Sequence, residues 1–288
     1  MKVWAPGDPL PGAERPSYLA HANADAQLYL VHHACAAARP RATVVLAGPM
    51  TLERTQSYLS WVRLARNLAL NGYDVVRFDY RGTGESTGEF RAQTFFTWRA
   101  DLMAVVTHAK ALHEGRVVVL GLRLGALLAK PLFEDGLIDG LVAWEPPASG
   151  RVMMMDMLRR KLAADYMEFP EAPRKVRDDY VRDLARGLEV EVEGYPWTKG
   201  VWASAEAFSF GEPERIGGEW LTVFLDGRAP DKLPATRRNQ YASFKIPRPS
   251  FWLQSTHLVA DLADLFTVTQ ERLHQWTNAW SVTDGGAP

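Results

Sequence analysis

The segment with the most chemical content is Gly121-Leu122-Arg123-Leu124-Gly125, which follows an apolar run and precedes a helix-forming run. Two glycines around a central residue are typical of a nucleophile elbow, a tight strand-to-helix turn that projects its middle side chain. The central residue here is Arg123, and a guanidinium has no proton that it can lose near neutral pH. Arg123 therefore cannot attack a carbonyl carbon, and an acyl-serine mechanism is excluded at this position.

Three roles for Arg123 follow from its place at a helix N-terminus, where backbone N–H groups favour anions. Its planar fork could bind a carboxylate or phosphate group of a ligand. It could instead form an internal ion pair with Glu145, which is expected at the end of the neighbouring strand. It could also stabilise an oxyanion while a histidine moves a proton. The sequence leaves these three roles open.

Residues for acid–base chemistry are expected after the elbow in the chain, because the order of a hydrolytic triad on such a scaffold is nucleophile, acid, histidine. His257 follows an apolar run at 250–254, and Asp231 lies in the loop after another at 220–225. We predict that His257 is the general acid–base and that Asp231 orients it, with Asp226 as the alternative acid.

The usual place of an oxyanion loop is occupied by Gly48-Pro49-Met50. Backbone N–H groups of Met50 or Thr51 could donate to an oxyanion there, whereas Pro49 has no N–H to give. The predicted substrate contacts are Met50, Thr51, Arg123, Leu124 and Glu145.

Other nucleophiles are poorly placed. Cys35 lies too early in the chain to meet His257, and Ser86 is better explained as a turn or capping residue. Ser149 could approach the site, but its sequence context shows no activating neighbour.

Alternating strands and helices are expected to position these groups. The predicted strands are 27–32, 43–47, 73–79, 116–120 and 137–144, and the predicted helices are 57–70, 96–112 and 124–133. This alternation indicates βαβ units and a mostly parallel sheet flanked by helices, an α/β fold. Sheet-like patterning returns at 220–225 and 250–254, and a final helix is expected at 259–276.

The alternation of strands and helices stops between residues 150 and 213, where two charged stretches at 153–167 and 173–188 have helical spacing. We predict a helical cap over 150–213, inserted into a core made of 1–149 and 214–288. The three consecutive methionines at 153–155 could line an apolar channel, but a place in the helix core is favoured.

The order of these parts resembles the α/β-hydrolase superfamily: a glycine break at 48–49, an Asp-x-x-Gly-x-Gly-x-Ser loop at 79–86, the elbow, a cap and a late histidine. Residues 121–126, 144–151 and 193–195 are similar to those of the exosortase A system-associated hydrolases, found near exopolysaccharide and protein-sorting genes. This resemblance implies an arginine at the elbow and a role in a biosynthetic or export pathway.

Bulk properties narrow the class of protein. The chain has 288 residues, 47% of them hydrophobic and 23% charged, with a formal net charge of -1 and one cysteine. Nothing here predicts nucleic acid, a membrane span, a cofactor or a metal site, and no disulfide can form within the chain. A cytoplasmic location is expected, and a homodimer is possible.

Two functions remain. The first is an enzyme without a serine nucleophile that acts on an acyl, ester or anionic substrate, with Arg123 anchoring the anion and His257 and Asp231 as acid and base. The alternative is a non-catalytic pseudo-hydrolase that binds a ligand or a protein partner.

Overall fold

The computed structural model describes residues 4, 7–21, 26–171, 173–211, 218–225, 240–246, 250–254 and 262–283. Its centre is an eight-stranded sheet in the order β1-β2-β4-β3-β5-β6-β9-β10. The strands are β1 (Glu14–Ala20), β2 (Gln27–His33), β3 (Thr43–Ala47), β4 (Asp74–Phe78), β5 (Val117–Leu122), β6 (Gly140–Trp144), β9 (Glu219–Phe224) and β10 (Tyr241–Ser243). All neighbours from β4 to β10 pair in parallel, whereas β1–β2 and β2–β4 are antiparallel.

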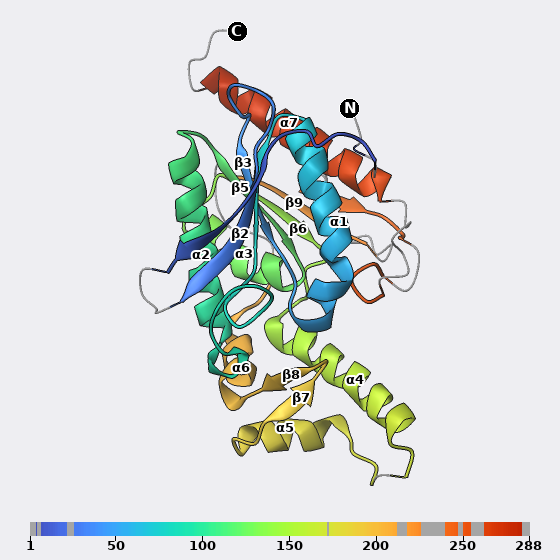
Figure 1. Cartoon of the computed structure of the whole chain (residues 1–288). Coiled ribbons are helices and arrows are strands. Elements are labelled where there is room, and N and C mark those ends of the chain that lie inside the picture. The colour runs from blue at the N-terminus through green and yellow to red at the C-terminus, as the bar shows by residue number, and fades with distance from the viewer. Residues whose placement is uncertain are drawn as a thin grey trace.

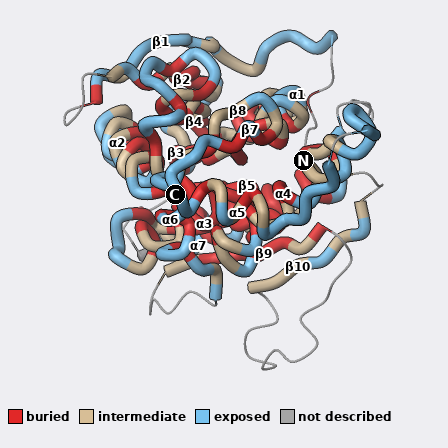
Figure 2. The backbone as a smooth tube through the Cα atoms, turned by 90° about the horizontal axis from the view of Figure 1, so that it is seen from below, coloured by how far each residue is buried: buried red, intermediate tan, exposed pale blue. Residues whose placement is uncertain are grey.

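Helices cover both faces of the sheet (Figure 1). They are α1 (Thr51–Leu70), α2 (Phe95–Leu112), α3 (Leu124–Glu134) and α7 (Ala263–Thr283), with a 3-10 turn, η1, at Phe90–Ala92. Alternate residues of the central strands serve opposite cores: Val45 and Val119 pack with α2 and α3, and Val44 and Val118 with α1 and α7. Buried residues accordingly follow the central strands and the inward sides of the helices (Figure 2). The predicted α/β fold with a mostly parallel sheet is confirmed.

Residues 150–171 and 173–211 gather beyond one end of the sheet (Figure 1). They include α4 (Gly150–Glu168), α5 (Arg177–Ala185), β7 (Val190–Val192), β8 (Tyr195–Trp197), α6 (Lys199–Ser204) and the 3-10 turn η2 (Ala205–Ala207). The antiparallel β7–β8 hairpin was not expected in a segment predicted to be helical. Met153 and Met154 of α4 are fully buried in the core shared with α2 and α3.

Two predicted elements differ from the structure. Helix α1 begins at Thr51 rather than at 57, so its polar first turn precedes the apolar face that marked the helix. Residues 250–254 form a turn, closed by the Leu253 N–H donating to the Ser250 carbonyl at 2.8 Å, and not a strand. Phe251 and Trp252 are buried against α7 instead, because a short apolar run does not distinguish strand from buried turn. The last described strand is β10.

Within the described part of the chain, no helix has both the length and the hydropathy needed to cross a membrane.

Candidate functional site

The turn between β5 and α3 has the strained geometry of an elbow. Arg123 adopts φ 55° and ψ -109°, a region that L-residues rarely occupy. A Cβ atom at Gly121 would overlap the backbone of the first turn of α3, and one at Gly125 would overlap the carbonyl of Ala47 in β3. Glycine is therefore required on both sides of Arg123, which explains the spacing seen in the sequence.

The guanidinium of Arg123 is bound by a buried carboxylate from α1. Its Nε lies 3.4 Å from Oε2 of Glu53, and its Nη2 lies 3.4 Å from Oε1. The side chain of Glu53 has no solvent exposure, and that of Arg123 is 10% exposed. A buried charge needs a partner, and each of these residues supplies one to the other.

The internal partner proposed from the sequence was Glu145, and this proved to be the wrong residue. Glu145 ends β6 and uses Oε2 to accept the backbone N–H of Leu225 at 2.6 Å. Its own N–H donates to the carbonyl of Val223 at 2.8 Å. Glu145 therefore joins the ends of β6 and β9, two strands that are hydrogen-bonded neighbours.

A second arginine joins Glu53 to the 150–213 segment. Arg160 of α4 places Nη2 3.1 Å from Oε1 of Glu53 and 2.9 Å from Oε1 of Glu193, and its Nε donates to the same Glu193 oxygen at 3.0 Å. Glu193 lies in the turn between β7 and β8. We call Arg123, Glu53, Arg160 and Glu193 the charge network. Its two positive and two negative side chains balance.

Glu193 also occupies the N-terminus of α1. Its Oε2 accepts the hydroxyl of Thr51 at 2.6 Å and the backbone N–H of Leu52 at 3.3 Å. The first N–H groups of a helix donate hydrogen bonds to anions, and this helix follows the loop where an oxyanion was predicted to bind. A carboxylate of the chain itself is bound there instead.

Backbone strain is concentrated around the charge network. In the described residues, the non-glycine residues with positive φ are Thr51 at 50°, Arg123 at 55°, Glu145 at 42° and Glu193 at 55°. Two of these belong to the network, Thr51 binds it, and Glu145 follows Trp144, whose carbonyl accepts the N–H of Arg123 at 3.1 Å. Strained non-glycine residues persist only where the surroundings hold them, and they cluster at functional sites.

The remaining predicted site residues fall into two groups. Met50, Thr51 and Leu124 are at most 1% exposed, with Met50 and Leu124 packed in the core. His257, Asp231 and the alternative acid Asp226 lie outside the described residues, so the acid–base pair remains a prediction.

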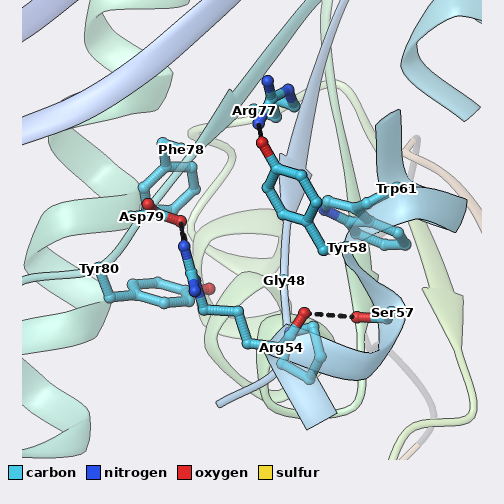
Figure 3. Close-up of a pocket in the computed structure, with 10 residues that line it drawn as sticks. Gly48, Arg54, Ser57, Tyr58, Trp61, Arg77, Phe78, Asp79 and Tyr80 are labelled. Carbon is cyan, nitrogen blue, oxygen red and sulfur yellow. Dashed lines mark hydrogen bonds and ion pairs between the residues drawn. The ribbon is translucent and has the colours of Figure 1, made fainter. Parts of the chain in front are cut away.

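A hollow lies beside the Gly48-Pro49 loop (Figure 3). It is lined partly by Tyr58, Trp61 and Tyr80, and it encloses about 30 Å³. The indole Nε1 of Trp61 and the hydroxyl of Tyr80 are buried there without a hydrogen-bond partner. This volume accommodates about one or two water molecules, which such polar atoms would bind, and it is too small for an acyl substrate.

Three members of the network, Glu53, Arg160 and Glu193, were not singled out as site residues from the sequence. Glu53 lies before residues 57–70, whose apolar spacing predicted the helix. Arg160 lies in the charged stretch 153–167, where an arginine is expected to face solvent. An acidic residue in the first turn of a helix is common because it suits the helix dipole, so nothing in the sequence distinguished Glu53 as a buried member of the network.

A separate group in the described residues could hold a metal ion: His32, Asp74 and His113. It lies where β4 begins, at the opposite end of the parallel strands from the elbow.

Comparisons with known proteins agree with this geometry. A hydrolase family model described as "Serine aminopeptidase, S33" matches residues 38–163. No curated protein matches the chain.

Solved structures of low sequence identity share the fold. Est1E from Butyrivibrio proteoclasticus, bound to ferulic acid, is 17% identical over 90% of this chain and 99% of its own, with a TM-score of 0.59. Mouse alpha/beta hydrolase domain-containing protein 10 is 13% identical over 91% and 99%, with a TM-score of 0.57. An α/β serine hydrolase without a lid from Xanthomonas campestris is 17% identical over 93% and 98%, with a TM-score of 0.51. The sheet order, the strained elbow and the similarity to these solved structures show that this chain has the α/β-hydrolase fold.

Proposed function

We propose that this chain is a non-catalytic relative of the α/β hydrolases, which binds a ligand or a protein partner and does not turn over a substrate. The observation that carries the proposal is the Arg123–Glu53 pair. At the position where the fold presents its nucleophile, the chain has a guanidinium bound to a carboxylate that has no solvent exposure.

The rest of the charge network supports the same conclusion. Because its two guanidiniums and two carboxylates balance, no net positive charge remains for an anionic substrate. Glu193 already accepts hydrogen bonds from the Thr51 hydroxyl and the Leu52 N–H, beside the Met50 and Thr51 N–H groups that were predicted to bind an oxyanion. These contacts weigh against Arg123 as an anion anchor, because a bound anion would have to displace a carboxylate of the chain.

A second candidate is an enzyme in which His257, oriented by Asp231, activates water or moves a proton. The observation that favours it is the retained strain at Thr51, Arg123 and Glu193. Such strain costs on the order of 1–3 kcal/mol per residue, and a site that had lost all activity would be free to relax.

The two candidates differ in whether His257 matters for chemistry. The purified protein is assayed against a panel of esters, thioesters, lactones and amides, alongside His257→Ala and Asp231→Asn. We expect rates equal to spontaneous hydrolysis for all three proteins. Turnover by the parent protein that is lost in His257→Ala would overturn the proposal and establish the second candidate.

A matched probe of the elbow uses Arg123→Ser with a fluorophosphonate, which labels only an activated serine. The parent protein is expected to stay unlabelled. Thermal melting of the variant must show that it is folded before its labelling is interpreted, because Glu53 loses one of its two cationic partners. Labelling of the folded parent at any serine would contradict the absence of an activated nucleophile.

A further inference from the structure

Two imidazoles converge on one buried carboxylate at the end of the sheet opposite the elbow. Nε2 of His32 lies 2.8 Å from Oδ2 of Asp74, and Nε2 of His113 lies 2.6 Å from the same oxygen. All three potential ligand atoms lie within 4.8 Å of one another. Two imidazole nitrogens and a carboxylate oxygen form a donor set that binds zinc and related divalent ions.

We propose that His32, Asp74 and His113 form a binding site for a divalent transition-metal ion of the zinc class, with a water molecule in the fourth position. The three residues come from different elements: His32 from β2, Asp74 from the start of β4, and His113 from the residue after α2. A bound ion would therefore fasten the end of α2 to two strands of the sheet.

The carboxylate is already oriented for this role. Asp74 is 2% exposed, and its other oxygen, Oδ1, accepts the backbone N–H of Cys35 at 2.9 Å. This hydrogen bond fixes the carboxylate so that Oδ2 is directed towards the two imidazoles. Outer hydrogen bonds of this kind orient metal ligands and are a regular part of metal sites.

Only a small rearrangement is needed to admit an ion. Metal–ligand bonds of about 2.0–2.1 Å in a tetrahedral site separate the ligand atoms by about 3.3 Å, compared with 2.6–2.8 Å between nitrogen and oxygen here. His113 is the residue free to retreat, since its side chain is 41% exposed, whereas that of His32 is 11% exposed. Each ring then binds through the lone pair of Nε2, and the proton now shared with Asp74 is released or carried on Nδ1.

An entry path is present. His113 lines a surface hollow of about 470 Å³, together with Arg39, Pro40, Thr43 and Glu114. Of the three proposed ligands His113 lines this hollow, and its Nε2 contacts Oδ2 of Asp74, so an ion would enter past His113 and its fourth position would be open to water on that side. An open fourth position of this kind distinguishes a site with three protein ligands from a closed structural one.

The test uses tag-free full-length protein treated with a chelator and then dialysed. Zn²⁺ is titrated by calorimetry, and Co²⁺ is followed by the visible absorption of its tetrahedral complexes. We expect one equivalent of either ion to bind. At an ion concentration one hundred times the dissociation constant, the melting temperature should rise by about 4 °C.

Variants decide whether these three residues are the ligands. His113→Gln is partly exposed and should keep its fold, as checked by circular dichroism in chelator, while its affinity falls at least about tenfold. The control is His274→Gln, which removes a half-buried histidine that hydrogen-bonds Tyr73 and leaves the proposed ligands intact; its affinity should match the parent. The proposal fails if the parent binds neither ion at millimolar concentration, or if His32→Gln and His113→Gln combined bind as tightly as the parent.

Discussion

Neutralising Glu53 gives the sharpest test of the charge network. In Glu53→Gln, Arg123 keeps its place in a site where it is 10% exposed but loses its counter-charge. Two unit charges 3.4 Å apart attract by about 5 kcal/mol at an effective dielectric constant of about 20. Removing one partner of a buried pair costs about 3–5 kcal/mol. That is a large part of the roughly 5–15 kcal/mol by which a protein of this kind is stable.

The assay is urea unfolding at neutral pH, followed by far-ultraviolet circular dichroism and by tryptophan fluorescence. We expect Glu53→Gln to lower the free energy of unfolding by about 3–5 kcal/mol. The control is Arg159→Ala, which lies beside Arg160 on α4 and breaks an exposed pair with Asp156. That change should cost less than about 1 kcal/mol, as exposed ion pairs do.

A second variant separates a buried charge from a lost contact. Combining Glu53→Gln with Arg123→Met removes both charges of the pair and retains similar volumes, so most of the lost stability should return. The reasoning is refuted if Glu53→Gln costs less than about 1 kcal/mol, the scale of an exposed pair, or if the double variant is no more stable than Glu53→Gln alone.

Three further predictions concern the scaffold. Gly125→Ala should cost at least about 2 kcal/mol in chemical unfolding, because its Cβ would overlap the backbone of β3; an unchanged midpoint would contradict the elbow geometry. Met153→Ala should cost about 2–5 kcal/mol while Met167→Ala on the same helix, 86% exposed, costs little, and equal losses would argue against Met153 as core. Burial, with the Arg77 charge, lowers the pKa of His33 from 6.5 to about 4. Below pH 6.5 the unfolded chain binds a proton at His33 that the folded chain does not bind until about pH 4, so the free energy of unfolding falls by at most about 3 kcal/mol between these pH values. The free energies of unfolding of the parent and of His33→Gln should therefore differ at pH 7 and approach each other in acid. A difference that stays constant over this pH range would refute the prediction.

Strongly patterned elements could be predicted from the sequence. The buried parallel strands, the glycine-bounded elbow and the α2 and α3 helices were all expected within a few residues of their places. Each rests on local information: apolar runs of strand length, helical spacing, or a backbone position that only glycine tolerates. The same local logic failed at 250–254, where two buried aromatic residues occupy a turn.

The partner of Arg123 could not be predicted in this way. The internal partner considered from the sequence, in one of three open roles, was Glu145, which is expected at the end of the adjacent strand. The carboxylate that binds the guanidinium comes instead from Glu53, 70 residues upstream. Ion pairs between distant segments depend on how the helices are packed, and no period or motif in the sequence encodes that choice.

The span of the charge network has a consequence for how the molecule assembles. Its contacts join residues separated by 70, 107 and 142 positions along the chain. Contacts between residues this far apart are unfavourable early in folding, because closing a long loop loses conformational entropy before the contact contributes any favourable energy. The sheet should therefore form while these four side chains are still hydrated, and the 150–213 segment should dock last. By the same reasoning it should be the first to detach, as a local unfolding unit that leaves the sheet intact.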